Sequence, residues 1–350
     1  MLEFLSGRLG FRVDLVMPAD APTVAVVSGH GVRLRLDSSG GALTNVAPVV
    51  LRLECDASAL ANGAGEPPSG IRIEWAGTNA APDILECRNE FVLTRFTDEN
   101  AWGIGRAGML YRDLIPDRMG GRFIASHIRI VAGGAVPDYV HFHKIRFQMI
   151  YCKAGSVQVV YEDQGPPFVL ESGDCVLQPP QIRHRVLHAT AGAEVIEIGC
   201  PAVHETVADH DLSLPTTRID PDRLFGGQRF VRHVAAKAIW SSWLGENFET
   251  RDTGIADATF GLADVRVVRL RAQAERSIEA DSATLRSHDG ELLFLFVLNG
   301  TLDLVGDAIG RHELHAGDAC AIPANHDFFL HARPGLKFLE VSLRAERAGD

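Results

Sequence analysis

The sequence predicts an all-β protein in which one domain is present twice, and three observations lead to this fold class. From about residue 120 onward, short runs of β-branched, aromatic and aliphatic residues follow one another, separated by Gly, Pro and Asp. No long helical periodicity interrupts these runs. A set of landmarks then recurs in the same order later in the chain. Short strands at such close spacing are typical of a sandwich, a jelly roll or a barrel.

The predicted strands of the first copy lie between residues 120 and 200. Each is bounded by turn-forming residues and is rich in side chains that favour an extended backbone. They are Phe123–Val131, Phe147–Cys152, Val157–Tyr161, Phe168–Leu170, Cys175–Gln178 and Val195–Gly199.

The second copy is predicted from a nearly constant offset between matching landmarks. The offset is 139 for an Arg-Asp pair (251 − 112), 145 for a glycine that ends an apolar strand (300 − 155) and 144 for a Gly-Asp turn followed by a proline (317 − 173). Ordered landmarks at such spacing indicate a duplicated domain. The matched segments are Tyr111-Arg112-Asp113 with Thr250-Arg251-Asp252, Gly155 with Gly300, Ser172-Gly173-Asp174 with Ala316-Gly317-Asp318, and Pro179 with Pro323.

The composition excludes several classes of partner. The formal net charge is −11 and Lys and Arg form no long block, so neither nucleic acid nor an anionic membrane surface is expected as the main partner. No apolar run approaches the length of a membrane span, and the N-terminus shows no secretory signal. The six cysteines include no C-x-x-C pair, which fits a reducing, cytoplasmic location.

The residues expected to carry chemistry are three histidines. His141 and His143 lie one residue apart on a predicted strand, so both side chains point to the same face. His184 follows about forty residues later, after a Gly-Asp turn and a pair of prolines, and can fold back beside them. Three imidazoles that converge inside a β-barrel make a site for a divalent transition metal.

The spacing around these histidines resembles the two-part signature of the cupins. The resemblance covers roughly residues 105–205, and it implies a jelly-roll barrel with a metal inside one end. A weaker copy at about 247–345 makes the whole chain similar to a bicupin. The two parts of the signature are His141-Phe142-His143, four residues, Gln148, six residues and Gly155, and then Gly173, five residues, Pro179, four residues and His184.

The resemblance implies that His141, His143 and His184 are metal ligands and that Gln148 occupies the position of a glutamate ligand. In the second copy the aligned positions keep one histidine of four, so that barrel is predicted to bind no metal. These aligned positions are Arg286, His288, Leu293 and Phe328.

Gln148 bears on the kind of substrate that such a site favours. A glutamate would cancel one positive charge of the metal, whereas Gln binds weakly through its carbonyl oxygen or hydrogen-bonds a ligand. Three neutral imidazoles and Gln148 leave a charge of +2, which favours an anionic, bidentate oxygen ligand. The ligand set is similar to that of three-histidine cupin dioxygenases and implies Fe(II), with Zn, Ni or Mn as alternatives. The competing interpretation is that Gln148 only fills space and that the site takes up adventitious zinc.

Alternation along the strands adds further candidates. Arg146 is predicted to share a face with Gln148, where it could pair with an anionic substrate, or to lie on the surface. His188 is predicted to share a face with His184 and could act as an acid or base, orient a ligand or be a core residue. A thiol near the metal is possible for Cys152. The predicted apolar wall, which favours a substrate with an apolar part, consists of Phe123, Ile150, Val186 and Ile196.

The sequence therefore predicts a bicupin, that is, two jelly-roll β-barrels, preceded by a small β-rich domain. The predicted divisions are an N-terminal β-rich region at 1–100, a metal-binding cupin domain at 101–206, a linker at 207–245 and a degenerate cupin domain at 246–350. A short helix is expected in the linker at Phe230–Trp240.

The predicted function is that of an Fe(II)-dependent dioxygenase that acts on a small oxygen-chelating substrate, such as a diketone or a hydroxylated aromatic. A homodimer is expected, because open barrels expose strand edges that need cover. One alternative is an O2-independent isomerase, lyase or decarboxylase with Mn, Ni or Zn, which would need His188 or Tyr139 as a proton shuttle. Another is a bicupin that binds a small molecule without catalysis.

Overall fold

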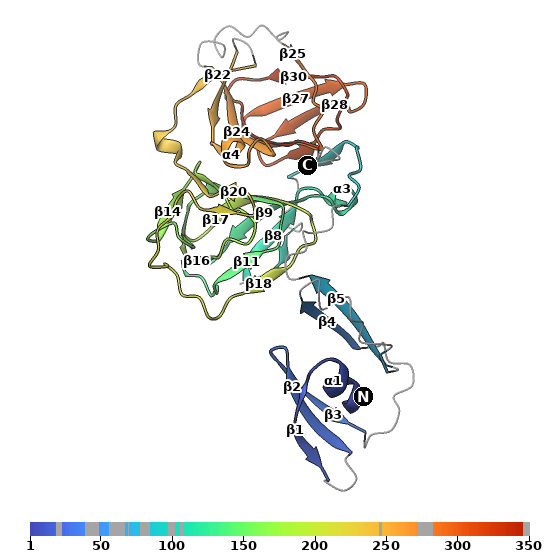
Figure 1. Ribbon diagram of the computed structural model, residues 1–350. Coiled ribbons are helices and arrows are strands. Elements are labelled where there is room, and N and C mark those ends of the chain that lie inside the picture. Colours follow the sequence, from blue (N-terminus) through green and yellow to red (C-terminus); the bar gives the residue numbers. More distant parts are fainter. Residues whose placement is uncertain are drawn as a thin grey trace. The chain divides into compact units, whose positions relative to one another are not determined.

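The computed structural model of the chain contains two compact units, Met1–Ala80 and Ala81–Asp350 (Figure 1). No helix among the described residues is long and apolar enough to cross a membrane. The structure describes residues 1–18, 23–38, 49–55, 67–68, 70–77, 85–96, 102–105, 108–244, 247–271 and 283–345.

The first unit is rich in β-structure and has a small core. The buried side chains that cluster in this core are Leu5, Leu9, Phe11, Val27 and Leu53. The unit ends at Ala80, before the predicted boundary at residue 100, because the next strand along the chain joins a sheet of the second unit. Its elements are the helix α1 (Leu2–Arg8), the antiparallel strands β1 (Arg12–Met17), β2 (Val24–Gly29) and β3 (Val32–Asp37), and the parallel pair β4 (Val49–Cys55) and β5 (Ile71–Gly77).

The first barrel of the second unit is formed by two antiparallel sheets. All six predicted strands are present, with ends that differ from the prediction by at most two residues. One sheet runs in the order β21 (Val231–His233), β15 (Cys175–Leu177), β12 (Phe147–Ala154), β17 (Ala193–Cys200), β9 (Ile124–Ile130), β8 (Leu110–Asp113) and β7 (Gly103–Ile104). The other runs in the order β14 (Phe168–Glu171), β13 (Ser156–Tyr161), β16 (His184–Ala189), β11 (His141–His143) and β18 (Thr206–Ala208), with β10 (Gly134–Ala135) paired to β16.

The second barrel repeats this strand order, which confirms the predicted duplication. Its first sheet runs in the order β22 (Ser241–Trp243), β23 (Phe248–Asp252), β24 (Ala263–Leu270), β31 (Lys337–Leu343), β26 (Leu292–Asn299), β29 (Ala319–Ala321) and β6 (Val92–Thr94). Its second sheet runs in the order β25 (Ala283–Arg286), β30 (Phe328–Ala332), β27 (Thr301–Gly306) and β28 (Gly310–His315).

The two barrels exchange a strand. β6 precedes the first barrel in the chain but pairs with β29 of the second, and β21 precedes the second barrel but pairs with β15 of the first. The two exchanged strands begin 139 residues apart (231 − 92), the offset found for the Arg-Asp landmarks. The N–H of Ala235 donates to Asp174 and that of Phe96 donates to Asp318, each at 2.7 Å. The sheet edges at β15 and β29 are therefore covered within one chain, without a second copy.

The linker takes part in both barrels. The prediction of a helix at Phe230–Trp240 is wrong for most of its length, since β21 occupies its first part and only a single turn, η3 (Ala235–Lys237), is helical. Ladder hydrogen bonds to the open edge of β15 favour an extended backbone there over the local helix propensity. The remaining short elements of this unit are α3 (Arg118–Gly121), β19 (Leu224–Phe225), β20 (Gln228–Arg229) and α4 (Ile255–Ala258).

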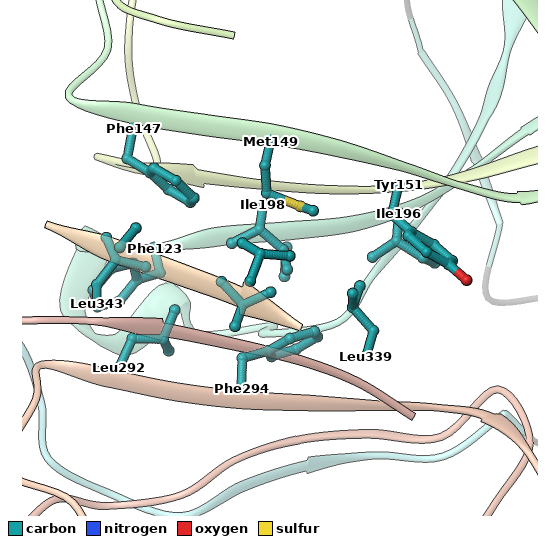
Figure 2. Packing of buried hydrophobic residues seen from close by; sticks show 14 of the residues in the cluster. Phe123, Phe147, Met149, Tyr151, Ile196, Ile198, Leu292, Phe294, Leu339 and Leu343 are labelled. Atoms are coloured by element: carbon teal, nitrogen blue, oxygen red, sulfur yellow. The ribbon is translucent and has the colours of Figure 1, made fainter. Parts of the chain in front are cut away.

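A hydrophobic core joins the two barrels (Figure 2). Phe123 and Ile196 lie in this core, so the prediction that they line the pocket is wrong. Both faces of β12 and β17 are buried, one inside the barrel and one against the second barrel, and alternation along a strand cannot tell two buried faces apart. Figure 2 shows Phe147, Met149, Tyr151 and Ile198 of the first barrel opposite Leu292, Phe294, Leu339 and Leu343 of the second.

A buried polar cluster lies beside this core. Arg112 donates from Nη2 to the carbonyl oxygen of Gly317 in the second barrel at 2.7 Å, and the same nitrogen lies 3.2 Å from Nδ1 of His127. Nε2 of His127 lies 2.9 Å from Glu194, which also accepts from Lys153 at 2.6 Å. Arg112 can only donate and the carboxylate only accepts, so the ring of His127 is the neutral tautomer with its hydrogen on Nε2.

Acid is expected to destabilise the protein through His127. Burial lowers the pKa of His127 below its ordinary value of about 6.5, so the unfolded chain binds a proton more readily than the folded protein. The stability that the neutral ring contributes is therefore present above about pH 6.5 and is lost as the pH falls toward the lower pKa of the folded state. We expect the melting temperature to fall by several degrees between about pH 7.5 and about pH 5.5, and to fall less in His127→Gln.

Comparing the wild type with His127→Gln separates the effect of His127 on the melting temperature from the effects of other titrating groups. Hydrogen bonds from His127 and Lys153 hold the pKa of Glu194 well below its ordinary value, so the contribution of Glu194 is lost only in more acidic solution. Burial also lowers the pKa of His233 and His288. An equal fall in the wild type and in His127→Gln would show that those histidines carry the effect instead.

Candidate metal centre

Three histidines from neighbouring strands meet inside the first barrel. β11 carries His141 and His143, and β16, its partner in the sheet, begins at His184. His141 and His184 are paired directly across the two strands, and His143 lies two residues along on the same face. All three are buried, and one ring nitrogen of each lies within 4.8 Å of the other two. Within the described ranges, no other His, Cys, Asp or Glu side chains form such a group.

The Nδ1 atom of each ring is held by a neighbouring group. Nδ1 of His141 and Nδ1 of His184 each lie within 3.0 Å of the carbonyl oxygen two residues earlier in the chain. A carbonyl can only accept, so these Nδ1 atoms carry the hydrogen and Nε2 offers its lone pair. Nδ1 of His143 lies 2.9 Å from the hydroxyl of Thr206. A donor set of three neutral imidazoles, oriented in this way, fits a divalent transition metal.

Gln148 lines the interior of the barrel, where it contacts a carboxylate that sequence reasoning missed. Its Nε2 donates to Oε1 of Glu197 at 2.5 Å. Glu197 lies on β17 and pairs with Ile150, two residues beyond the pairing of Gln148 with Gly199, so the two side chains are diagonal neighbours on one face. Glu197 on the adjacent strand β17 therefore supplies a carboxylate close to the position where a glutamate at 148 would have placed one.

Two more polar side chains complete this end of the barrel. Tyr161 donates from its hydroxyl to Oε1 of Gln178 at 2.5 Å, and Nε2 of Gln178 lies 3.5 Å from Nε2 of His184. Burial holds the pKa of Tyr161 well above its ordinary value, so the hydroxyl keeps its hydrogen. The amide nitrogen of Gln178 can only donate, which agrees with a lone pair on Nε2 of His184.

A cavity of about 370 Å³ lies beside the histidines. His143, His184, Gln148 and Glu197 contribute to its wall, and Ile150 and Val186, two of the four residues predicted for an apolar wall, also line it. Its volume lies in the range of cavities that bind small organic molecules. A metal held by the histidines would therefore have room for a small ligand beside it.

His188 lies outside this site, and the prediction that it shares a face with His184 is wrong. β16 pairs with β13 through a β-bulge, in which Val186 pairs with Val159 while His188 already pairs with Gln158. The extra residue reverses the alternation, so Val186 lines the cavity and His188 is exposed.

Arg146 and Cys152, the other two candidates on the segment of Gln148, do not line the cavity. Arg146 precedes the first residue of β12, so the alternation of the strand does not extend to it, and its guanidinium pairs with Glu291 at the contact with the second barrel. The prediction that Arg146 shares the face of Gln148 is therefore wrong. Cys152 packs in the apolar interior of the barrel, where burial raises the pKa of its thiol to about 12.

The sequence does contain a signal for Glu197. It stands in the middle of the apolar predicted strand Val195–Gly199, on the face opposite to Ile196 and Ile198. A charged residue at the centre of such a strand is unusual unless it has a polar partner in the interior. The duplication repeats the feature, because Glu340 lies in β31 with an offset of 143 (340 − 197).

The second barrel keeps the strand pairing of the first but only one of its three histidines, His288 at the position of His143. Arg286 pairs with Phe328 as His141 pairs with His184, which agrees with the alignment made from sequence. The guanidinium of Arg286 forms two hydrogen bonds with Glu340, one from each terminal nitrogen. The second barrel therefore has a largely buried ion pair at the strand positions where the first barrel has the candidate metal centre.

Comparisons with known proteins agree with the fold. Neither a protein-family model nor a curated protein matches the sequence. Among solved structures, the chain is similar to a salicylate 1,2-dioxygenase from Pseudaminobacter salicylatoxidans, with 16% identity, 75% of this chain and 86% of that chain covered, and a TM-score of 0.51. It is also similar to the protein Ylba from E. coli, with 11% identity, coverage of 77% and 97%, and a TM-score of 0.50.

A deletion mutant of oxalate decarboxylase from Bacillus subtilis gives 15% identity, coverage of 72% and 76%, and a TM-score of 0.49. The similarities to the dioxygenase and to Ylba show the fold alone, because the identities are this low. Together with the repeated strand order and the three-histidine group, they define the class of the protein. The chain has the double-barrel cupin fold, with a group of three histidines in its first barrel that can hold a divalent metal.

Proposed function

We propose that this bicupin is a metal-dependent dioxygenase that acts on a small, oxygen-chelating organic substrate such as a diketone or a hydroxylated aromatic. The observation that carries the proposal is the three-histidine group beside a cavity of about 370 Å³. Fe(II) is the proposed metal, because sites with few protein ligands and open positions suit non-haem iron, and Zn, Ni and Mn are the alternatives. The described function of one structural neighbour, salicylate 1,2-dioxygenase, supports this reaction class.

Each side chain has a proposed role. Bound Fe(II) would supply the redox chemistry that allows a chelated substrate to react with O2. His141, His143 and His184 would hold the ion, and the contacts of their Nδ1 atoms fix the orientation of the rings. Gln148 is proposed to orient Glu197 through one hydrogen of its amide nitrogen and to hydrogen-bond the substrate through the rest of the amide.

The two alternative functions have less support. An O2-independent isomerase, lyase or decarboxylase was expected to use His188 or Tyr139 as a proton shuttle, and neither lines the cavity. A closed barrel with no room beside the metal would have favoured a bicupin without catalysis, whereas a cavity lies beside the histidines. The same cavity is walled largely by apolar side chains, which suits the exclusion of water from a reaction.

Oxygen uptake tests the proposed function. Protein loaded with Fe(II) under nitrogen is mixed with aerated buffer that contains, in turn, a β-diketone, a catechol or a gentisate-type acid. We expect uptake with at least one compound, about a hundredfold or more above that of His184→Ala treated in the same way. No uptake by iron-loaded protein with any compound would contradict a dioxygenase, and product formed without uptake would establish the O2-independent alternative.

A further inference from the structure

Strand pairing divides the cavity into layers. The layer at the histidines is polar, because Gln178 follows β15 beside Gln148 and Tyr161 pairs with His184. Two residues further along the strands, about 7 Å away, the lining residues are apolar except for Glu197. The layer beyond is apolar except for Tyr111, which pairs with Ile128. The apolar residues of these two layers include Ile150, Val159 and Val186, and then Ile128, Val157 and Val195.

Glu197 is the one acidic side chain among the described residues that line the cavity, and no Lys or Arg among them accompanies it. A carboxylate offers about four lone-pair sites, and the amide of Gln148 takes one of them. Glu197 can therefore accept a hydrogen from a ligand in the cavity. A ligand that brings its own carboxylate would meet a like charge with no cationic side chain beside it, and such a juxtaposition is costly.

The second barrel shows which groups a glutamate at this position binds. Glu340 has the strand position of Glu197. Glu197 pairs with Ile150, five residues before Gly155, and Glu340 pairs with Leu295, five residues before Gly300. The two carboxylate oxygens of Glu340 accept hydrogen bonds from the two terminal nitrogens of Arg286, and Arg286 aligns with His141 of the first barrel. In the first barrel a histidine replaces that arginine, and Glu197 faces the cavity instead.

We infer that Glu197 determines substrate specificity by accepting a hydrogen from a hydroxyl of the chelating head, and so favours an enol or an ortho-diol with an apolar body over any substrate that carries a carboxylate. This inference rests on the proposed function, because it requires the substrate to bind at the three-histidine centre. Gln148 fixes the orientation of the acceptor, and the apolar layers receive the body of the substrate.

Binding to zinc-loaded protein tests the inference without turnover, because zinc has no redox chemistry. Calorimetric titrations compare catechol, 4-tert-butylcatechol, 3,4-dihydroxybenzoate and salicylate. We expect 4-tert-butylcatechol to bind about tenfold more tightly than catechol, because its alkyl group enters the apolar layers. Both carboxylates are expected to bind at least about tenfold more weakly than catechol. Equal or tighter binding of either carboxylate would overturn the inference.

The variant Glu197→Gln gives a second test, since the amide keeps the size of the side chain and removes its charge. Salicylate is expected to bind this variant about tenfold more tightly than the wild type, and catechol about fivefold more weakly. The control is Glu313→Gln, which changes an exposed carboxylate on β28 of the second barrel and should leave both affinities unchanged. Unchanged selectivity in Glu197→Gln would contradict the role of Glu197. The titrations of the wild type stand even if this variant does not fold.

Zinc content separates this inference from the proposed function. If dialysed wild-type protein retains no stoichiometric zinc, then the proposed centre itself is wrong. If the protein holds about one zinc per chain and still prefers carboxylates, then the centre stands and the specificity assigned to Glu197 fails.

Discussion

Replacing His184 by alanine is expected to remove the metal from the protein. The three imidazoles are the whole set of clustered nitrogen ligands among the described residues, and the loss of His184 leaves two on β11. A divalent metal held by two neutral imidazoles exchanges readily with solvent. We expect the metal content after dialysis to fall from about one per chain to below about one tenth, and any oxygen uptake to fall with it.

The matched control is His188→Ala, the same substitution four residues along the same strand. Its side chain is exposed outside the barrel because of the bulge in β16, so we expect wild-type metal content and activity. Elemental analysis of the two dialysed variants provides the measurement. Loss of metal from both variants, or from neither, would show that the centre is not where the three histidines meet.

Replacing Glu291 by glutamine is expected to lower the stability of the protein strongly, because it removes ion pairs between the two barrels. Glu291 directly precedes β26 of the second barrel and accepts hydrogen bonds from Arg122 and Arg146 of the first. The side chain of Glu291 is 7% exposed, and those of Arg122 and Arg146 are 4% and 12% exposed. The substitution leaves two buried guanidinium groups without their counter-charge. We expect the free energy of unfolding to fall by about 3 kcal/mol or more.

Glu313→Gln again serves as the comparison, because its carboxylate pairs with Arg333 on the surface, where both side chains are about half exposed. Surface pairs of this kind contribute about 0–1 kcal/mol. Denaturant unfolding of the two variants, followed by fluorescence, gives both free energies. A loss in Glu291→Gln no larger than that in Glu313→Gln would mean that the arginines find other partners or become hydrated.

Six strands of the first barrel were predictable because each is short, rich in side chains that favour an extended backbone and bounded by Gly, Pro or Asp. The extended backbone of β21, where a helix was expected, was not predictable, because its partner strand β15 lies more than fifty residues earlier in the chain. Gln148 and Ile150 were assigned to the interior correctly, because β12 is regular at these positions. Phe123 was assigned to the cavity wall incorrectly, because both faces of the neighbouring strand β9 are buried and alternation cannot tell them apart.

The sequence by itself determined the all-β class, the duplication and the shared face of His141 and His143, because the two-residue alternation of a strand and the spacing of its turns are local properties. The resemblance to the cupins implied the two barrels and the grouping of the three histidines. Only the tertiary structure decided which polar groups surround them. A bulge directs His188 outward, the second barrel binds Arg146 through Glu291, and the pairing of β12 with β17 brings Glu197 to Gln148. These arrangements depend on how distant segments pair, and no local pattern in the chain encodes that pairing.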